Sequence, residues 1–221
     1  MDGYLRTVAA IAYKDLVVEL RTRETLVAGA VLALIIVTIF AFALELPPAT
    51  ARAVAPGLLW STLAFAGVLV FGRLFAPERD RGSLDGLLLA PADPSALYLG
   101  KMAGATTFMA LVGVVALPGL AVLTGAPLLN AAVLPVALLG LLGLAAAGTL
   151  FAALALSGRA RDVLLPVLFL PLSIPVVLTA TGATRLAVEG APSGGALGVL
   201  AACDALYIAA STLLFPYVVE E

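Results

Sequence analysis

The sequence contains no histidine and a single cysteine, Cys203. Without histidine, the commonest imidazole ligand of zinc, copper and haem iron is missing, and one cysteine cannot close a disulfide within the chain. No nucleophile can be matched with a histidine base, and Gly100-Lys101 lacks the upstream glycine of a phosphate-binding loop. We therefore expect no catalytic site and no metal site, and we do not expect the chain to be an enzyme.

Charge is also scarce. Charged residues make up 12% of the 221 residues and apolar residues 62%, whereas a soluble domain has about 25% and about 45–50%. This composition predicts an integral membrane protein. The net charge is −2 and no basic cluster is present, so nucleic acid is not an expected partner. Charged residues recur through the first 25 positions, so we expect no cleavable signal peptide.

Uncharged runs long enough to cross a bilayer divide the chain, at about 20 residues for each span. We expect six transmembrane helices at about 25–44, 53–72, 102–124, 130–157, 163–184 and 196–219. The uncharged run from 102 to 158 must fold back once, and Gly125-Ala126-Pro127 has the composition of a turn. The predicted fold class is therefore an all-α membrane protein, with residues 1–221 forming a single transmembrane domain.

The basic residues predict the orientation of these helices. Ten of the twelve lie at the N-terminus and in the second and fourth loops, and two lie in the first and fifth loops. The excess of Lys and Arg on one side indicates the cytoplasm. We therefore expect both termini and residues 73–101 to be cytoplasmic.

Residues 2–24 are predicted to form an amphipathic helix in the membrane interface. Its apolar face carries Leu5, Ala9, Ala12, Leu16 and Leu20. Three basic side chains of this segment are candidates for contact with a partner: Lys14, Arg21 and Arg23. The alternative interpretation is that the segment only leads into the first span.

The segment 73–101 is polar and lies between two apolar runs, which is typical of a water-facing loop. Gly82-Ser83 followed by Leu84, Leu87 and Leu88 predicts an N-cap and a short helix with one apolar face. Asp93-Pro94 predicts the N-cap and first position of a second helix. The chain has no energy source of its own, so we interpret the loop as a docking element for a soluble partner. The alternative is a solvated run of charges without a partner.

Several residues within the spans are candidates for packing or for a ligand path. Trp60 is interpreted as a packed aromatic, and the glycines and alanines from Gly140 to Ala152 as close helix contacts within the subunit, with dimerisation as the alternative. Pro171 and Pro175 predict a kink or break in the fifth span, with Ser173 bonding a freed carbonyl. This irregularity either lines a path or only bends the helix. Asp204 is expected near the outer face, where a carboxylate is inexpensive.

The polar loop resembles the coupling loop of ABC-2 type permeases, the element that abuts an ATPase subunit. The matching residues, which the resemblance implies contact the ATPase, are Glu78, Arg79, Asp80, Arg81, Gly82, Ser83, Leu84, Asp85, Leu87, Leu88 and Pro91. Together with the stretches at 54–60 (VAPGLLW), 73–75 (RLF), 100–101 (GK) and 170–175 (LPLSIP), nearly the whole chain resembles the CcmB family, the permeases of the cytochrome c maturation system.

The resemblance implies a multi-pass subunit of the bacterial inner membrane, in a homodimer or hetero-oligomer. Its implied partners are an ATPase subunit (CcmA-like), a haem-handling membrane subunit (CcmC-like) and a haem chaperone (CcmE-like) that is released in its haem-loaded form. No cofactor is expected on this chain, since ATP belongs to the ATPase and haem to the complex. Two alternatives are an ABC-2 type exporter of a lipid or drug, and a membrane scaffold for an assembly complex without transport.

Overall fold

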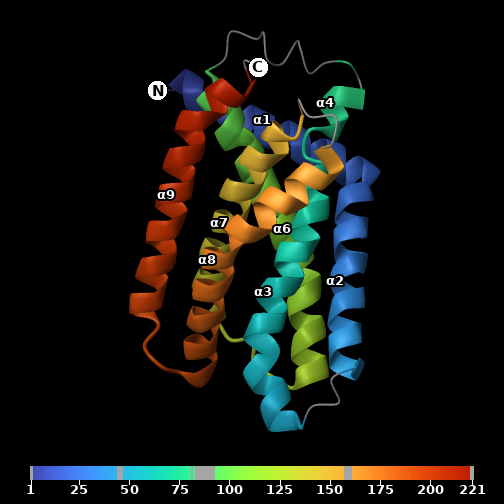
Figure 1. Ribbon diagram of the computed structural model, residues 1–221, viewed down its shortest axis with the longest axis vertical. Coiled ribbons are helices and arrows are strands. Elements are labelled where there is room, and N and C mark those ends of the chain that lie inside the picture. Colours follow the sequence, from blue (N-terminus) through green and yellow to red (C-terminus); the bar gives the residue numbers. More distant parts are fainter. Residues whose placement is uncertain (1, 44–46, 81, 83–92, 157–160, 220–221) are drawn as a thin grey trace.

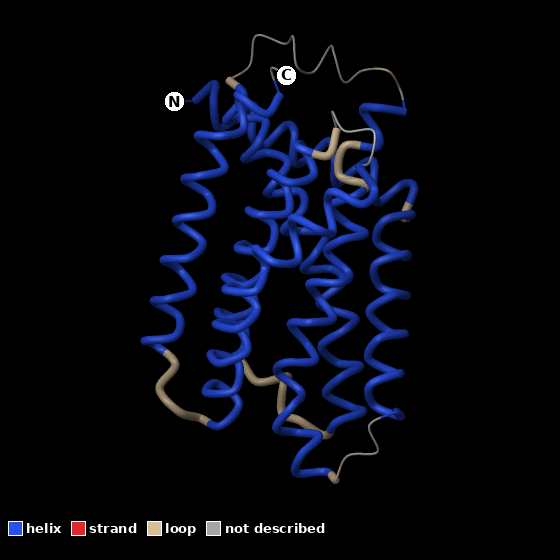
Figure 2. The backbone as a smooth tube through the Cα atoms, viewed as in Figure 1, coloured by secondary structure: helices blue, strands red, loops and turns tan. Residues whose placement is uncertain are grey.

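The computed structural model describes residues 2–43, 47–80, 82, 93–156 and 161–219, and these residues form helices and turns without a β-strand. The helices are α1 Asp2–Thr22, α2 Glu24–Ala43, α3 Pro48–Gly72, α4 Ala76–Asp80, α6 Pro94–Thr124, α7 Val133–Leu154, α8 Arg161–Glu189 and α9 Gly194–Val219. Figure 2 shows that helix accounts for most of the traced backbone. The all-α prediction is confirmed.

Six of these helices are long and apolar enough to cross a membrane: α2, α3, α6, α7, α8 and α9. They run side by side, and α1 lies across the end of the bundle where both termini and α4 are found (Figure 1). We call this the charged end. The number of candidate spans, six, and the separate N-terminal helix agree with the sequence prediction.

The core is built around α7, which packs against α3, α6, α8 and α9. Every residue from Gly143 to Ala153 is buried. A Cβ atom added at Gly140 would overlap the indole of Trp60, and one at Gly148 would overlap the ring of Phe71. These glycines therefore provide the space for two aromatic side chains of α3, which favours the interpretation as packing within the subunit.

The outward surfaces of the bundle are apolar. Large side chains are exposed along α2 and α9, among them Val31, Ile39, Leu206 and Leu213. Such a surface is unstable in water but is suited to lipid chains, in which the helices satisfy their own backbone hydrogen bonds. The exposed apolar side chains therefore agree with a bundle that crosses a bilayer.

The ends of the helices are partly as predicted. Asp93 caps α6 by accepting from the Ser95 N–H at 2.8 Å, with Pro94 in the first turn, and α6 ends at Gly125 in the left-handed conformation (φ 66°). Two predicted boundaries are wrong. Arg52 lies inside α3 because this helix begins at Pro48, and Lys101 lies inside α6 rather than in a loop.

The fifth span, α8, is one continuous helix in spite of Pro166, Pro171 and Pro175. Figure 1 shows it changing direction along its length, so the prolines bend the helix and do not break it. The Ser173 hydroxyl donates to the Leu170 carbonyl at 2.7 Å. Pro171 and Pro175 would free the carbonyls four residues earlier, at Val167 and Pro171, and Ser173 bonds neither of them, so the expectation that Ser173 bonds a freed carbonyl is wrong.

Candidate functional site

Four ionisable side chains from three helices meet at the charged end. Lys101 of α6 lies between two carboxylates, with its Nζ 2.8 Å from Glu78 Oε1 of α4 and 3.1 Å from Asp15 Oδ2 of α1. Lys14 of α1 pairs with both acids, at 3.1 Å from Asp15 Oδ1. We call Lys14, Asp15, Glu78 and Lys101 the charged cluster. It joins the two ends of the segment 73–101 to α1.

The charged cluster is removed from solvent. The exposed fractions are 0% for Lys101, 4% for Glu78 and 6% for Asp15. The Lys101 ammonium also donates to the Leu74 carbonyl at 3.0 Å, so that three acceptors surround its three N–H groups. Two cations and two anions balance the formal charge. A buried ammonium is tolerated only with such pairing, since an unpaired one costs several kcal/mol, about 3–5 when one partner is removed.

The turn between α3 and α4 positions Glu78 and places the Phe75 ring next to Lys101. The chain leaves α3 after Gly72, and Pro77 lies in the first turn of α4, where a missing N–H costs nothing. The Phe75 ring lies 4.8 Å from Lys101 Nζ, within the range of a cation–π contact. On the other side, α1 can approach α6 closely because Gly100 has no side chain, and a Cβ there would come 2.7 Å from Ile11.

Lys14 is the half-exposed member of the charged cluster, with 44% of its side chain accessible. Burial lowers the pKa of Lys14, but the hydrogen bond to Glu78 and the charges of Asp15 and Glu78 outweigh it, so the pKa stands above the usual lysine value. Lys14 therefore remains a cation at physiological pH.

Helix α1 buries two acids against the bundle and leaves part of its predicted apolar face exposed, while Ile11 and Leu16 pack against the core. Asp15 and Glu19 are buried, whereas Leu5 and Leu20 of the predicted apolar face are 60% and 51% exposed. A helix in water would have the opposite arrangement. The exposed apolar face is suited to lipid, which agrees with the predicted interfacial position.

The joint between α1 and α2 is made by polar contacts. Arg23 adopts a left-handed conformation (φ 57°), which ends α1. Glu19 Oε1 accepts the Leu26 N–H at 2.8 Å, which satisfies a free donor in the first turn of α2. Glu24 pairs with Arg73. Arg21 and Arg23 themselves are exposed, and only Lys14 of the three predicted contact residues joins the charged cluster.

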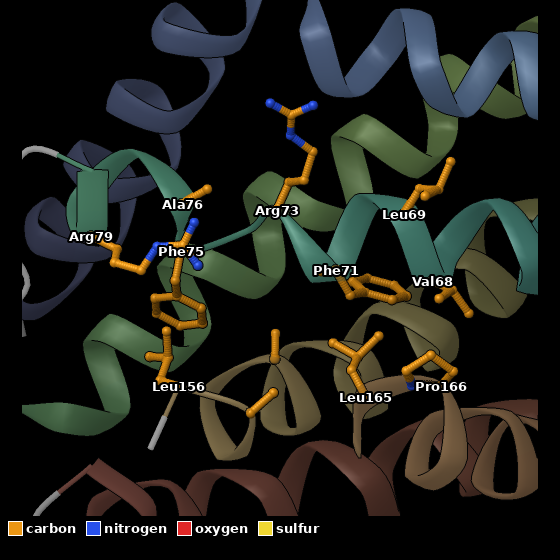
Figure 3. A pocket seen from close by; sticks show the side chains of 13 residues that line it. Val68, Leu69, Phe71, Arg73, Phe75, Ala76, Arg79, Leu156, Leu165 and Pro166 are labelled. Atoms are coloured by element: carbon orange, nitrogen blue, oxygen red, sulfur yellow. The ribbon is translucent and has the colours of Figure 1, made fainter. Parts of the chain in front are cut away.

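A cavity of about 270 Å³ lies beside α4, which carries Glu78 of the charged cluster, and between α3, α7 and α8. Figure 3 shows Phe71, Phe75, Leu156 and Leu165 around it, with the Arg79 side chain directed toward Phe75 and Arg73 extending away from them. Most of the residues that line it are apolar, and Arg73 and Arg79 are its charged lining residues.

The predicted coupling residues are only partly described. Glu78, Arg79 and Asp80 lie on α4, and Gly82 is exposed with φ 62°. The remaining candidates lie outside the described residues: Arg81, Ser83, Leu84, Asp85, Leu87, Leu88 and Pro91. The short leucine-bearing helix after Gly82 therefore stays a prediction.

The candidates for a path are packed into the bundle. Trp60 is fully buried and its Nε1 donates to Thr184 Oγ1 of α8 at 2.8 Å. Ser173 is also buried, at 2% exposure, whereas Pro171 and Pro175 are exposed on the outer side of α8. The structure thus joins Trp60 to α8 through Thr184 and does not gather these four residues into one polar site.

The buried acids and the role of Lys101 were not predicted from the sequence. Asp204 lies at mid-length of α9, and a Cβ added at Gly143, also at mid-length of α7, would overlap its carboxylate. Asp204 is 2% exposed, and neither carboxylate oxygen has a hydrogen-bond partner among the described residues. The expectation of a position near the outer face is therefore wrong. The facing Gly143 was visible in the sequence, but not its alignment with Asp204.

The described residues contain no group of three or more acidic or cysteine side chains arranged to hold a metal ion. What the charged end does contain is a set of ion pairs that tie α1, α4 and α6 together.

Comparison with known proteins places the chain in a family. The family model described as CcmB protein matches residues 6–220. Heme exporter protein B of Pseudomonas aeruginosa is 32% identical over 176 residues, which cover 78% of each chain. Heme exporter protein B of Rhodobacter capsulatus is 31% identical over 201 residues, covering 90% of this chain and 92% of the relative. The matched range includes the whole charged cluster, and the chain belongs to the CcmB protein family.

Proposed function

We propose that this chain is the permease subunit of an ABC transporter for cytochrome c maturation, in which a separate ATPase drives haem handling and the release of a haem-loaded chaperone. Family membership and the name heme exporter protein B of its relatives support the connection with haem. The absence of histidine from the sequence supports a role in transmitting motion rather than in ligating haem.

The charged cluster is the observation that carries the coupling part of this proposal. Glu78 lies near the start of the segment 73–101 and Lys101 at its end, and their contact of 2.8 Å holds the two ends together. Asp15 links both to α1. A load applied to the loop would therefore reach α3, α6 and α1 together and would not be absorbed by a flexible hinge. With the membrane orientation predicted from the basic residues, the charged end would be cytoplasmic and would face the ATPase.

The coupling role is tested by replacing Leu87 and Leu88 with Asp and co-purifying the ATPase. We expect the double variant to lose the ATPase, because the apolar contact would have to desolvate two carboxylates. The matched control is Leu213→Asp/Leu214→Asp on the exposed face of α9, which changes the charge equally and is expected to affect insertion but not ATPase contact in the inserted fraction. Full retention of the ATPase by the Leu87/Leu88 variant would contradict the proposal.

The link to cytochrome c is tested separately in a deletion strain. Loss of haem attachment to c-type cytochromes, restored by this chain but not by the Leu87/Leu88 variant, is the expected result. Normal cytochrome c in the deletion strain would instead favour an exporter of another substrate.

A further inference from the structure

The cavity between α3, α4, α7 and α8 lies where these helices pass from apolar to charged sequence. On α3 the uncharged run ends at Gly72 and Arg73 follows, and α8 begins with Arg161-Asp162 before its own uncharged run. Phe71 and Leu165, one from each of these junctions, line the cavity. In a membrane this level corresponds to the boundary between acyl chains and headgroups.

The cavity combines apolar lining residues with a cation at its side. Phe71, Phe75, Leu156 and Leu165 form the apolar part, and the Arg79 side chain reaches toward Phe75 (Figure 3). Arg73 also lines the cavity, but its side chain extends away from the aromatic rings, whereas Arg79 is directed toward Phe75 (Figure 3). The five N–H donors of Arg79 allow it to serve more than one acceptor at a time.

A ligand that fits must carry both an apolar body and an anionic oxygen group. Guanidinium groups bind phosphate through paired hydrogen bonds, and basic pockets between transmembrane helices at the cytoplasmic side are typical sites for acidic lipid headgroups. A free anion would leave the aromatic and aliphatic walls unused, and a neutral lipid would gain little from Arg79.

We propose that this cavity binds one anionic phospholipid, with Arg79 contacting the phosphate and the aromatic and aliphatic walls holding the first part of an acyl chain. The inference requires only that the chain spans a membrane, and it does not depend on the ATPase or on haem. The bound lipid would touch α4, the helix that carries Glu78.

The test measures lipid retention by the purified, delipidated full-length chain using native mass spectrometry. Phosphatidylglycerol and phosphatidylcholine with the same acyl chains are titrated in parallel. We expect phosphatidylglycerol to bind about tenfold more tightly, and Arg79→Gln to abolish that difference, since one hydrogen-bonded charge pair corresponds to roughly this factor. Arg185→Gln, which removes an exposed arginine at the other end of the bundle, is the matched control and should leave the preference intact.

A second variant tests the cavity without changing charge. Ala155 lines it, and Ala155→Leu is expected to weaken the binding of both lipids while circular dichroism shows the helices unchanged. Equal binding of the two lipids to the native chain would overturn the proposal, as would an equal loss in Arg79→Gln and Arg185→Gln. Displacement of phosphatidylglycerol by millimolar inorganic phosphate would identify a site for free anions and would also overturn it.

Discussion

Lys101 shows how a single residue can be misread from its neighbours in sequence. It closes a polar stretch, which predicts a place in a water-facing loop, yet its side chain is fully buried among Asp15, Glu78 and the Leu74 carbonyl. Composition cannot reveal this, because the two acids lie 86 and 23 positions away in the sequence. The pairing exists only after α1 has folded across α6.

Replacing Lys101 with Met is expected to destabilise the fold by about 3–5 kcal/mol, because it removes a fully buried cation from contact with two buried carboxylates. The measurement is the free energy of unfolding in mixed micelles, followed by circular dichroism during a titration with dodecyl sulfate. Lys14→Met is the matched control, and as a half-exposed lysine it should cost about 1 kcal/mol or less.

Adding Glu78→Gln to Lys101→Met should recover part of the loss, since it removes one of the uncompensated charges. Equal losses in the free energy of unfolding for Lys101→Met and Lys14→Met would contradict this prediction, because they would show that the burial of Lys101 adds nothing to its contribution.

At the scale of the helix, uncharged runs identify the six spans but not their ends. Helix α6 has 31 residues and a length of about 46 Å, whereas the hydrocarbon core of a bilayer is about 30 Å thick. The helix therefore extends into polar sequence on the charged end, which is why Lys101 lies within it. Local sequence signals did identify both ends of α6. The Asp93 side chain caps the start of the helix, Pro94 fits its first turn, and Gly125 ends it in a left-handed conformation. The packing of α1 was not predictable, since its charged side is satisfied by distant residues.

The Asp93 cap is expected to make the start of α6 sensitive to acid. Hydrogen bonds from the Ser95 side chain and then from its backbone N–H hold the pKa of Asp93 below its usual value. The cap therefore stabilises the helix above the unfolded-state pKa of about 3.9 and loses this contribution as the pH falls through the lower folded-state pKa. Asp93→Ala should cost about 1 kcal/mol at neutral pH.

Hydrogen exchange of the first turn of α6 measures this effect. Protection of the amides at 95–97 should fall about fivefold in Asp93→Ala at pH 7. Asp93→Asn keeps a capping oxygen without the ionisation, so its protection should not share the additional loss at acid pH. The same acid sensitivity in Asp93→Asn would assign the pH dependence to another group.

For the whole molecule, the structure agrees with the predicted bundle, and the orientation in the membrane remains a prediction from the basic residues. The two ends can be distinguished by cysteine labelling in a Cys203→Ser background. Gly3 at the charged end and Gly194 at the opposite end both have open space around a substituted side chain. In intact cells a membrane-impermeant maleimide should label Gly194→Cys, and should label Gly3→Cys only after the inner membrane is disrupted.

Labelling of Gly3→Cys in intact cells, with Gly194→Cys protected, would place the charged end outside and would remove the ATPase from reach of the loop. The candidate site would then have to bind a periplasmic partner. The fold itself would stand, because helix packing does not depend on which side faces the cytoplasm.

The contact between Asp204 and α7 also bears on how the chain enters the membrane. A carboxylate at the middle of a lone helix opposes insertion by about 2.5–3.5 kcal/mol. Gly143 offers the place where Asp204 packs, and α7 precedes α9 in the chain, so the docking surface is already synthesised when the last helix emerges. Helix α9 can therefore pack against α7 as it enters the bilayer, so that Asp204 is covered by Gly143 and its neighbours rather than exposed to lipid.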